Sequence, residues 1–234
     1  MSRVLCVGDI HEPVSRKKYL QFNKDLYEEY ECDRVVFLGD IAIGDVVDWT
    51  SISFHVAHPD APGPKDEYKL AFKKIHQWYK AFPNASICIG NHDERLIRLG
   101  EDNNIPKRFI RNFNEVWKTP KWNWDYFHII DDVYYFHGTG NGGTYPAPNA
   151  AKKMLMSVVM GHIHSAAGIK WLASPQRRIF GMDVGCGIDD TAYAFAYGKH
   201  QIKRSIISAA VVLDGIPYHE IMPIGKDERY HDGR

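Results

Sequence analysis

The sequence has no long apolar run, no excess of either charge and few cysteines, and each shortage excludes a class of protein. None of its apolar runs reaches the roughly 18 residues that a membrane-spanning helix needs. Lys plus Arg and Asp plus Glu number 29 each, so the formal net charge is zero. This balance argues against a surface that binds nucleic acid or membrane over its whole extent, although it allows a local basic patch.

The four cysteines, Cys6, Cys32, Cys88 and Cys186, show no C-x-x-C spacing of the kind that binds zinc. Three of them lie in or beside apolar runs, so we expect reduced and mostly buried thiols. An apolar strand begins within two residues of Met1, which leaves no room for a signal peptide. We therefore expect a cytoplasmic protein.

At 234 residues the chain suits one domain with a sizeable core. We place that domain at residues 1–224 and a polar, frayed tail at 225–234. Apolar runs alternate with helical stripes early in the chain and follow one another later. The expected strands are 3–7, 34–38, 85–89, 133–136, 157–160, 178–184, 209–213 and 218–222, and the expected helices are 14–30, 66–82 and 150–156, with short helices around Leu96 and Phe109.

Five of the apolar runs end in Asp, Asn or His. Buried acids and imidazoles are costly without a partner, so their repeated appearance at strand ends indicates a shared ligand. Carboxylate, carboxamide and imidazole are ligands for divalent metals, and a pair of metal ions is the simplest partner. The five segments are Gly8-Asp9-Ile10-His11, Gly39-Asp40, Gly90-Asn91-His92-Asp93, His137-Gly138 and Gly161-His162-Ile163-His164.

In this order the segments resemble the calcineurin-like metallophosphoesterase superfamily, whose pattern is D-x-H, GD, GNH-D/E, a lone H and G-H-x-H. The resemblance spans residues 9–164, about two-thirds of the chain. It implies an α/β (α+β) fold, a four-layer αββα sandwich of two mixed β-sheets flanked by helices. It also implies a metal-dependent phosphoric ester hydrolase.

The resemblance further implies two metal sites that share the carboxylate of Asp40. The first would contain Asp9, His11, Asp40 and His164, and the second Asp40, Asn91, His137 and His162. Oxygen and nitrogen donors suit Mn, Fe, Zn, Co or Ni, and we expect two divalent ions with Mn as the first choice.

In the family, a hydroxide that bridges both metals attacks phosphorus in line. Asp40 and His92 are the catalytic residues that the resemblance implies, with His92 as the acid for the leaving oxygen or as a cation that stabilises the phosphate. Asn91 and Arg95 are candidate substrate contacts, although Arg95 is equally compatible with an exposed helix arginine. Asp93 suits a structural or helix-capping acid better than a ligand.

The sequence departs from the family pattern at Ile43. The family often has an aspartate there, three residues after the Gly-Asp aspartate, and that aspartate orients the catalytic histidine. Asp45 and Asp48 are nearby and are candidates to replace it, but turn acids on a loop are an equally good interpretation.

Two other regions leave alternatives open. The Pro-rich segment 49–65 is expected to overhang the metal site, and its His55 and His58 are candidate substrate contacts, with solvent-facing loop histidines as the favoured alternative. Residues 94–128 mix basic and aromatic side chains, which can bind single-stranded nucleic acid. We favour a helical, aromatic-rich cap insertion with a buried aromatic cluster.

The predicted function is therefore dimetal-dependent hydrolysis of a phosphodiester or phosphomonoester, on a nucleotide or short nucleic acid. A serine/threonine protein phosphatase is the alternative, although the chain lacks the arginine of that family's Gly-Asp motif. A metal-bound, inactive scaffold is the non-enzyme alternative. The expected partner is a phosphoester, with a phosphoprotein as the second choice and no membrane, and the oligomeric state is open.

Overall fold

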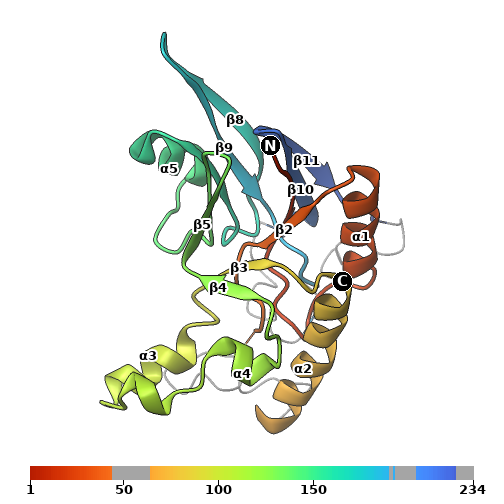
Figure 1. The fold of residues 1–234 in the computed structure, drawn as a ribbon, viewed down its shortest axis with the longest axis vertical. Helices are drawn as coiled ribbons and strands as arrows, with labels where there is room; N and C mark the ends of the chain where they lie inside the picture. The colour runs from red at the N-terminus through yellow and green to blue at the C-terminus, as the bar shows by residue number, and fades with distance from the viewer. Residues whose placement is uncertain (44–63, 190–191, 193–203, 225–234) are drawn as a thin grey trace.

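The structure is a computed structural model, and it describes residues 1–43, 64–189, 192 and 204–224. Strands and helices alternate in the first half of the described chain, and strands dominate the second half (Figure 1). The elements are β1 Arg3–Val7, α1 Tyr19–Glu29, β2 Arg34–Phe37, α2 Pro64–Ala81, β3 Ser86–Cys88, α3 Arg95–Asp102, η1 Lys107–Phe109, α4 Phe113–Trp117, β4 Asn123–Asp125, β5 Phe127–Ile130, β6 Val133–Phe136, α5 Pro146–Met154, β7 Ser157–Met160, β8 Ala167–Ala173, β9 Arg178–Val184, β10 Ser208–Leu213 and β11 Ile216–Ile221.

The strands form two mixed sheets. The first has the order β11-β10-β1-β2-β3-β4, in which β1 to β4 are mutually parallel. Strand β10 pairs antiparallel with β1, and β11 pairs antiparallel with β10. The second has the order β5-β6-β7-β9-β8, with β6, β7 and β9 parallel and an antiparallel strand at each edge. In each sheet the parallel strands are neighbours, so their carboxyl ends lie along one edge of the sandwich.

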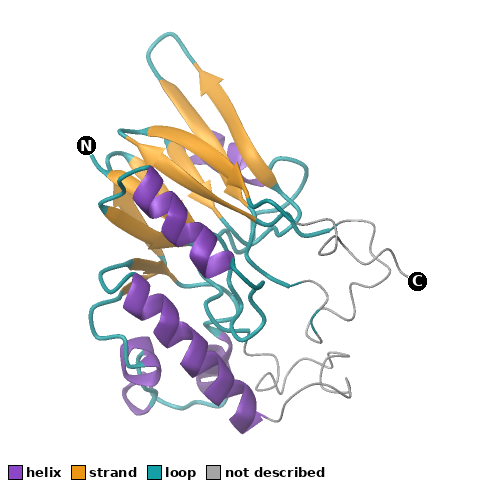
Figure 2. Ribbon diagram, turned by 90° about the vertical axis from the view of Figure 1, so that its right-hand side faces the viewer, coloured by secondary structure: helices purple, strands orange, loops and turns teal. Residues whose placement is uncertain are grey.

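Successive side chains of β1 point to opposite faces of the first sheet and so contact different layers of the sandwich. Leu5 and Val7 point to one face of the sheet and pack against α1 and α2, while Val4 and Cys6 point to the other face and pack against the second sheet. The outer face of the second sheet packs against Ala150 and Ala151 of α5. In Figure 1 the strands lie between α5 on one side and α1 on the other, and in Figure 2 the upper of the two long helices lies in front of the strands. The predicted αββα sandwich is confirmed.

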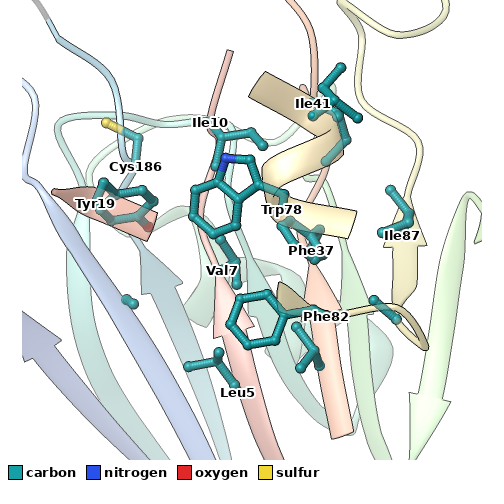
Figure 3. Close-up of a cluster of buried hydrophobic side chains, with 14 of the residues drawn as sticks. Leu5, Val7, Ile10, Tyr19, Phe37, Ile41, Trp78, Phe82, Ile87 and Cys186 are labelled. Atoms are coloured by element: carbon teal, nitrogen blue, oxygen red, sulfur yellow. The ribbon is translucent and has the colours of Figure 1, made fainter. Parts of the chain in front are cut away.

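The largest buried cluster lies under α1 and α2. Trp78 of α2 is 1% exposed and its ring meets that of Phe37 at 5.6 Å, edge to face. Figure 3 shows this ring among Ile10, Val7 and Phe37, next to the end of β1 and the loop that follows it. The core therefore holds that loop, which carries Asp9 and His11, against a rigid support.

Two predicted helices have different starts from those expected. Helix α1 begins at Tyr19 and not at residue 14, because the backbone of Ser15 and Arg16 pairs with Ile188 and Gly187. Helix α5 begins at Pro146 and not at residue 150. Long-range backbone pairing explains the later start of α1. A proline, which favours the first helical position, explains the earlier start of α5.

Residues 94–128 are only partly the helical cap that we predicted. Helices α3, η1 and α4 occupy its first part, and Figure 1 places α3 and α4 below the sheets, with α4 between α3 and α2. The expectation is wrong for the last six residues, because β4 joins the first sheet and β5 the second. Trp122 is 2% exposed and donates to Phe82 O, as the buried aromatic cluster predicts, whereas Phe109 is 70% exposed.

All four cysteines are reduced and buried, as predicted. Within the ranges that the structure describes, no helix combines the length and the apolar character needed to cross a bilayer.

Candidate metal centre and active site

The five polar segments of the sequence meet at one edge of the sandwich. Asp9, Asp40 and Asn91 follow the parallel strands β1, β2 and β3, and His137 and His162 follow the parallel strands β6 and β7. Because carboxyl ends of parallel strands share an edge, residues that are far apart in sequence become neighbours there. The two sheets thus contribute from both sides to one site.

The backbone at this edge is strained and closely packed. His11, Asp40 and His162 have φ angles of 44°, 49° and 68°, a left-handed conformation that non-glycine residues rarely adopt and that occurs preferentially at functional sites. A Cβ on Gly90 would collide with the carboxylate of Asp40, and one on Gly161 with that of Asp9. These glycines therefore give the two carboxylates their space.

The residues of the predicted first metal site lie together. Oδ2 of Asp9 is 3.2 Å from Nε2 of His164, which is 3.2 Å from Nε2 of His11. Nε2 of His11 is in turn 3.4 Å from Oδ2 of Asp40. Atoms of Asp9, His11 and His164 can surround one ion, since their ligand atoms all lie within 4.8 Å of one another.

The residues of the predicted second site are also together. Nε2 of His137 lies 3.3 Å from Oδ2 of Asp40, 3.0 Å from Oδ1 of Asn91 and 3.1 Å from Nδ1 of His162. Asp40, His137 and His162 form a second group whose ligand atoms lie within 4.8 Å of one another. Oδ2 of Asp40 therefore lies between the two groups, where a carboxylate shared by two ions has to lie.

This donor set fits two divalent cations. Asp9 is fully buried, and among the described residues its Oδ1 has no hydrogen-bond partner; Nδ1 of His137 lies 3.8 Å from it. Nδ1 of His137 lies 2.7 Å from the carbonyl oxygen of Leu38, so the ring donates there and turns the lone pair of Nε2 towards Asp40 and Asn91. Buried carboxylates and oriented imidazoles of this kind are compensated by metal ions.

Electrostatics link these groups closely. Burial alone would raise the pKa of Asp40, yet the charges of His137 and His92 hold that pKa well below its usual range. Burial likewise opposes the charged form of His137, but the carboxylates of Asp40 and Asp9 raise its pKa to about 10. Burial, and then the charge of His92, lower the pKa of His11. Without metal, a proton on His137 therefore neutralises part of the buried negative charge.

His92 lies beside the metal ligands and is held by the backbone. Its ring is 4.5 Å from that of His11, edge to face, and its backbone N–H donates to Oδ1 of Asp40 at 2.8 Å. Nδ1 of His92 lies 2.6 Å from the carbonyl oxygen of Ile43, and Nε2 lies 3.2 Å from Nη2 of Arg95. Arg95 is half-buried against the site and is not simply an exposed helix arginine.

Asp93 is a structural acid. Its Oδ1 accepts from Ile41 N at 3.0 Å and its Oδ2 from Gly90 N at 3.0 Å, which ties the loop after β2 to the loop after β3. Burial, and then the charge of Asp40, raise the pKa of Asp93 to about 7. It does not cap α3, which begins after Glu94 without a side-chain cap.

Some predicted contacts lie outside the described residues, namely His55, His58, Asp45 and Asp48. Among the residues that the structure does describe, two contributors were missed by the sequence reasoning, the carbonyl groups of Leu38 and Ile43. Main-chain acceptors carry no residue-type signal, so only the fold can reveal them.

Comparison with known proteins gives one family and several distant structures. The family model of the calcineurin-like phosphoesterases matches residues 2–186, whereas no curated protein sequence matches this chain. Vps29 from Chaetomium thermophilum is 10% identical over 97% of this chain and 92% of its own, with a TM-score of 0.49. A metallophosphoesterase from Sphaerobacter thermophilus is 17% identical over 95% and 88%, with a TM-score of 0.47. The phosphoesterase Yfce from E. coli is 12% identical over 90% and 88%, with a TM-score of 0.42.

These structural similarities are too distant to carry an argument about function, and the assignment rests on the family model. That model covers the strand ends that carry Asp9, Asp40, Asn91, His137 and His162, together with His164. The chain belongs to the calcineurin-like phosphoesterase family.

Proposed function

We propose that this protein is a phosphoesterase that uses two divalent metal ions, with a nucleotide or short nucleic acid as its substrate. The observation that carries the proposal is the position of Oδ2 of Asp40, 3.4 Å from Nε2 of His11 and 3.3 Å from Nε2 of His137. One carboxylate oxygen thus lies within 3.4 Å of a histidine from each group of donors. Asp9, His11 and His164 complete the first group, and Asn91, His137 and His162 complete the second.

Two divalent ions in this site would activate water for attack on phosphorus and neutralise the charge of the phosphate oxygens. Mn is our first choice of metal, with Fe, Zn, Co or Ni as alternatives. The chain supplies the other functions. In the metal-free site Arg95 donates to Nε2 of His92. With substrate bound, the guanidinium of Arg95 would turn to a phosphate oxygen, and Nε2, once protonated, would give its proton to the departing oxygen.

The carbonyl group of Ile43 bears directly on the inactive-scaffold alternative. The departure from the family pattern at residue 43 was the main reason to consider a scaffold, because His92 would have lost its orienting partner. The main-chain oxygen at that same position accepts from Nδ1 of His92. This contact supports an oriented, working histidine and therefore an enzyme. Reduced, buried cysteines support a cytoplasmic location.

The test is hydrolysis of bis-p-nitrophenyl phosphate and p-nitrophenyl phosphate by protein stripped of metal and reloaded with Mn. We expect turnover that depends on added metal and falls by at least about 100-fold in Asp40→Asn. Asp102→Asn, an exposed acid at the end of α3, is the matched control and should keep the wild-type rate. Bound metal without turnover on either ester would overturn the proposal and favour the scaffold.

A further inference from the structure

A cavity of about 270 Å³ lies between α2, α3 and α4, and both His92 and Arg95 line it. Its volume is close to the lower end of small-molecule sites, which run from about 300 Å³ to about 1,000 Å³. It has room for a ring system but not for a folded chain or a duplex. Because His92 belongs to both the cavity and the catalytic site, whatever occupies the cavity is next to the reacting ester.

The walls of the cavity are mostly apolar. The rings of Tyr68, Phe113 and Trp117 line one side, where those of Tyr68 and Trp117 stack on each other with their centroids 5.4 Å apart and their planes 25° from parallel. Apolar surface of this kind gains about 25 cal/mol for each Å² that a ligand removes from water. The apolar lining includes Ala71, Ile97, Ile110, Phe113, Val116 and Trp117.

A few polar groups interrupt these walls, and they differ in charge. Arg95 and Arg111 bring guanidinium groups suited to a phosphate, and the acids Glu67 and Asp93 lie in the same wall. Glu12 also lines the cavity, although it is only 1% exposed. Its Oε1 accepts from Ser15 and from Trp78 Nε1, whereas its Oε2 has no hydrogen-bond partner among the described residues.

The nearest cation to Oε2 of Glu12 is Nζ of Lys74, at 3.6 Å, which is longer than a hydrogen bond. A hydrocarbon occupant would leave this buried oxygen unsatisfied, which is unfavourable. An occupant with an N–H donor would satisfy it. Aromatic side chains, a carboxylate oxygen without a hydrogen bond and the neighbouring arginines together favour a nitrogen heterocycle that carries a phosphate.

We propose that this cavity binds the nucleobase of the substrate, on the leaving-group side of the ester. The base would lie against the aromatic wall with an N–H directed to Glu12, and its nucleoside oxygen would receive the proton from His92. This inference rests on the proposed function for the catalytic step but not for binding, so the two can fail separately.

Binding is tested first, without turnover. Saturation-transfer NMR on the full chain should detect binding of adenosine. Purine riboside, which lacks the exocyclic amine, should bind more weakly, and ribose should show no binding. Ala71→Leu fills the cavity and should reduce adenosine binding at least about 10-fold, the effect of a misfitting methyl-sized group in a pocket. The matched control is Ala81→Leu, ten residues further along α2 and outside the cavity lining.

Kinetics then test whether the bound base assists the reaction. Adenosine 5′-monophosphate and ribose 5-phosphate contain the same ester bond, and their methyl diesters form the equivalent pair if the enzyme prefers diesters. We expect kcat/KM to favour the adenosine compound at least about 10-fold, because binding of a remote group can be used at the reacting centre. Ile97→Ala should reduce this ratio at least about fivefold, whereas Ile129→Ala, an exposed isoleucine on β5, should not.

The outcomes separate the two proposals. Turnover of simple esters with equal kcat/KM for both sugars, and no adenosine binding, would overturn the cavity assignment and leave the phosphoesterase standing. Adenosine binding that Ala71→Leu abolishes, with no turnover of any ester, would support the cavity and overturn the proposed function. If Ala71→Leu does not fold, the Ile97→Ala and Ile129→Ala pair decides the cavity assignment by the same binding measurement.

Discussion

The Nδ1 atom of His92 lies 2.6 Å from the main-chain oxygen of Ile43, so a peptide carbonyl orients the imidazole that faces the metal site. A carbonyl fixes the ring and the tautomer as an aspartate would, but it adds no full negative charge. The consequence is that the side chain at position 43 is free to serve packing, and Ile43 is indeed fully buried with Val14.

Removing the imidazole of His92 should therefore lower kcat strongly, whereas changing the side chain at position 43 should hardly affect it. His92→Ala should lower kcat by about 10²–10⁴-fold, the usual contribution of a positioned acid, and leave the bound metal in place. Ile43→Val should keep kcat within about threefold, because the carbonyl remains and one methylene is lost from the core. Rates with Mn and metal content by mass spectrometry check both. A large loss in Ile43→Val with unchanged stability would show that the side chain itself orients His92.

A methyl group on Gly90 should disturb the metal centre more than one elsewhere. The added Cβ would collide with the carboxylate and backbone of Asp40, so the shared oxygen would have to move. We expect Gly90→Ala to bind at least one metal ion fewer and to lose most activity. Gly142→Ala is the control, since its Cβ would have no neighbour within 4 Å. Equal metal content in the two variants, by atomic absorption, would contradict the argument.

Metal loading should stabilise the fold and release a proton. His137, with a pKa of about 10 in the metal-free site, is protonated at neutral pH and has to lose that proton before it can bind an ion. Metal affinity should therefore rise by about tenfold per pH unit between pH 6 and 8 if one proton is displaced. Calorimetric titration with metal in two buffers of different ionisation enthalpy measures the number of protons released on binding.

The same linkage predicts a thermal shift. At a metal concentration of about 100 times Kd, folding gains about 2.7 kcal/mol for each independent site. Stripping the protein with a chelator should lower Tm, and Mn should restore it. A Tm that does not respond to metal, together with metal binding that is independent of pH, would mean that the buried donors are already satisfied by one another.

The family resemblance implied the sandwich, and the motifs placed the candidate ligands at strand ends, because motifs and strand patterns are both features of the chain itself. Apolar runs mark the strands, and Asp9, Asp40, Asn91, His137 and His162 stand where parallel strands end. Strands β4, β5 and β8 were missed. Two of them are only three and four residues long, and β8 lies at a sheet edge and contains Gly168 and Lys170. Their pairing partners, and not their own residues, make them strands.

Parts of the site that depend on the backbone could not be predicted. The carbonyl of Ile43 and the left-handed conformation at His11 and His162 are set by long-range contacts. The cavity beside His92 likewise arises only when α2, α3 and α4 come together. Sequence motifs identify ligands, whereas hydrogen bonds from peptide groups and the shape of the pocket require the fold.

Asp183 offers a test of the fold that is independent of the metal centre. This acid of β9 is 7% exposed and accepts only from Ala147 N, at 3.2 Å, among the contacts of the described chain, so burial raises its pKa to about 6. A folded-state pKa above the unfolded value of 3.8 stabilises the fold at low pH, and this contribution is lost as the pH rises through about 6. Asp183→Asn stays neutral and keeps an oxygen that can accept from Ala147 N.

Urea unfolding of metal-free protein should therefore find Asp183→Asn more stable than wild type by on the order of 2 kcal/mol at pH 8, with a difference that vanishes near pH 4. Asp102→Asn, the exposed control, should show no such trend, and a wild-type protein as stable as Asp183→Asn at pH 8 would mean that the buried carboxylate is fully compensated.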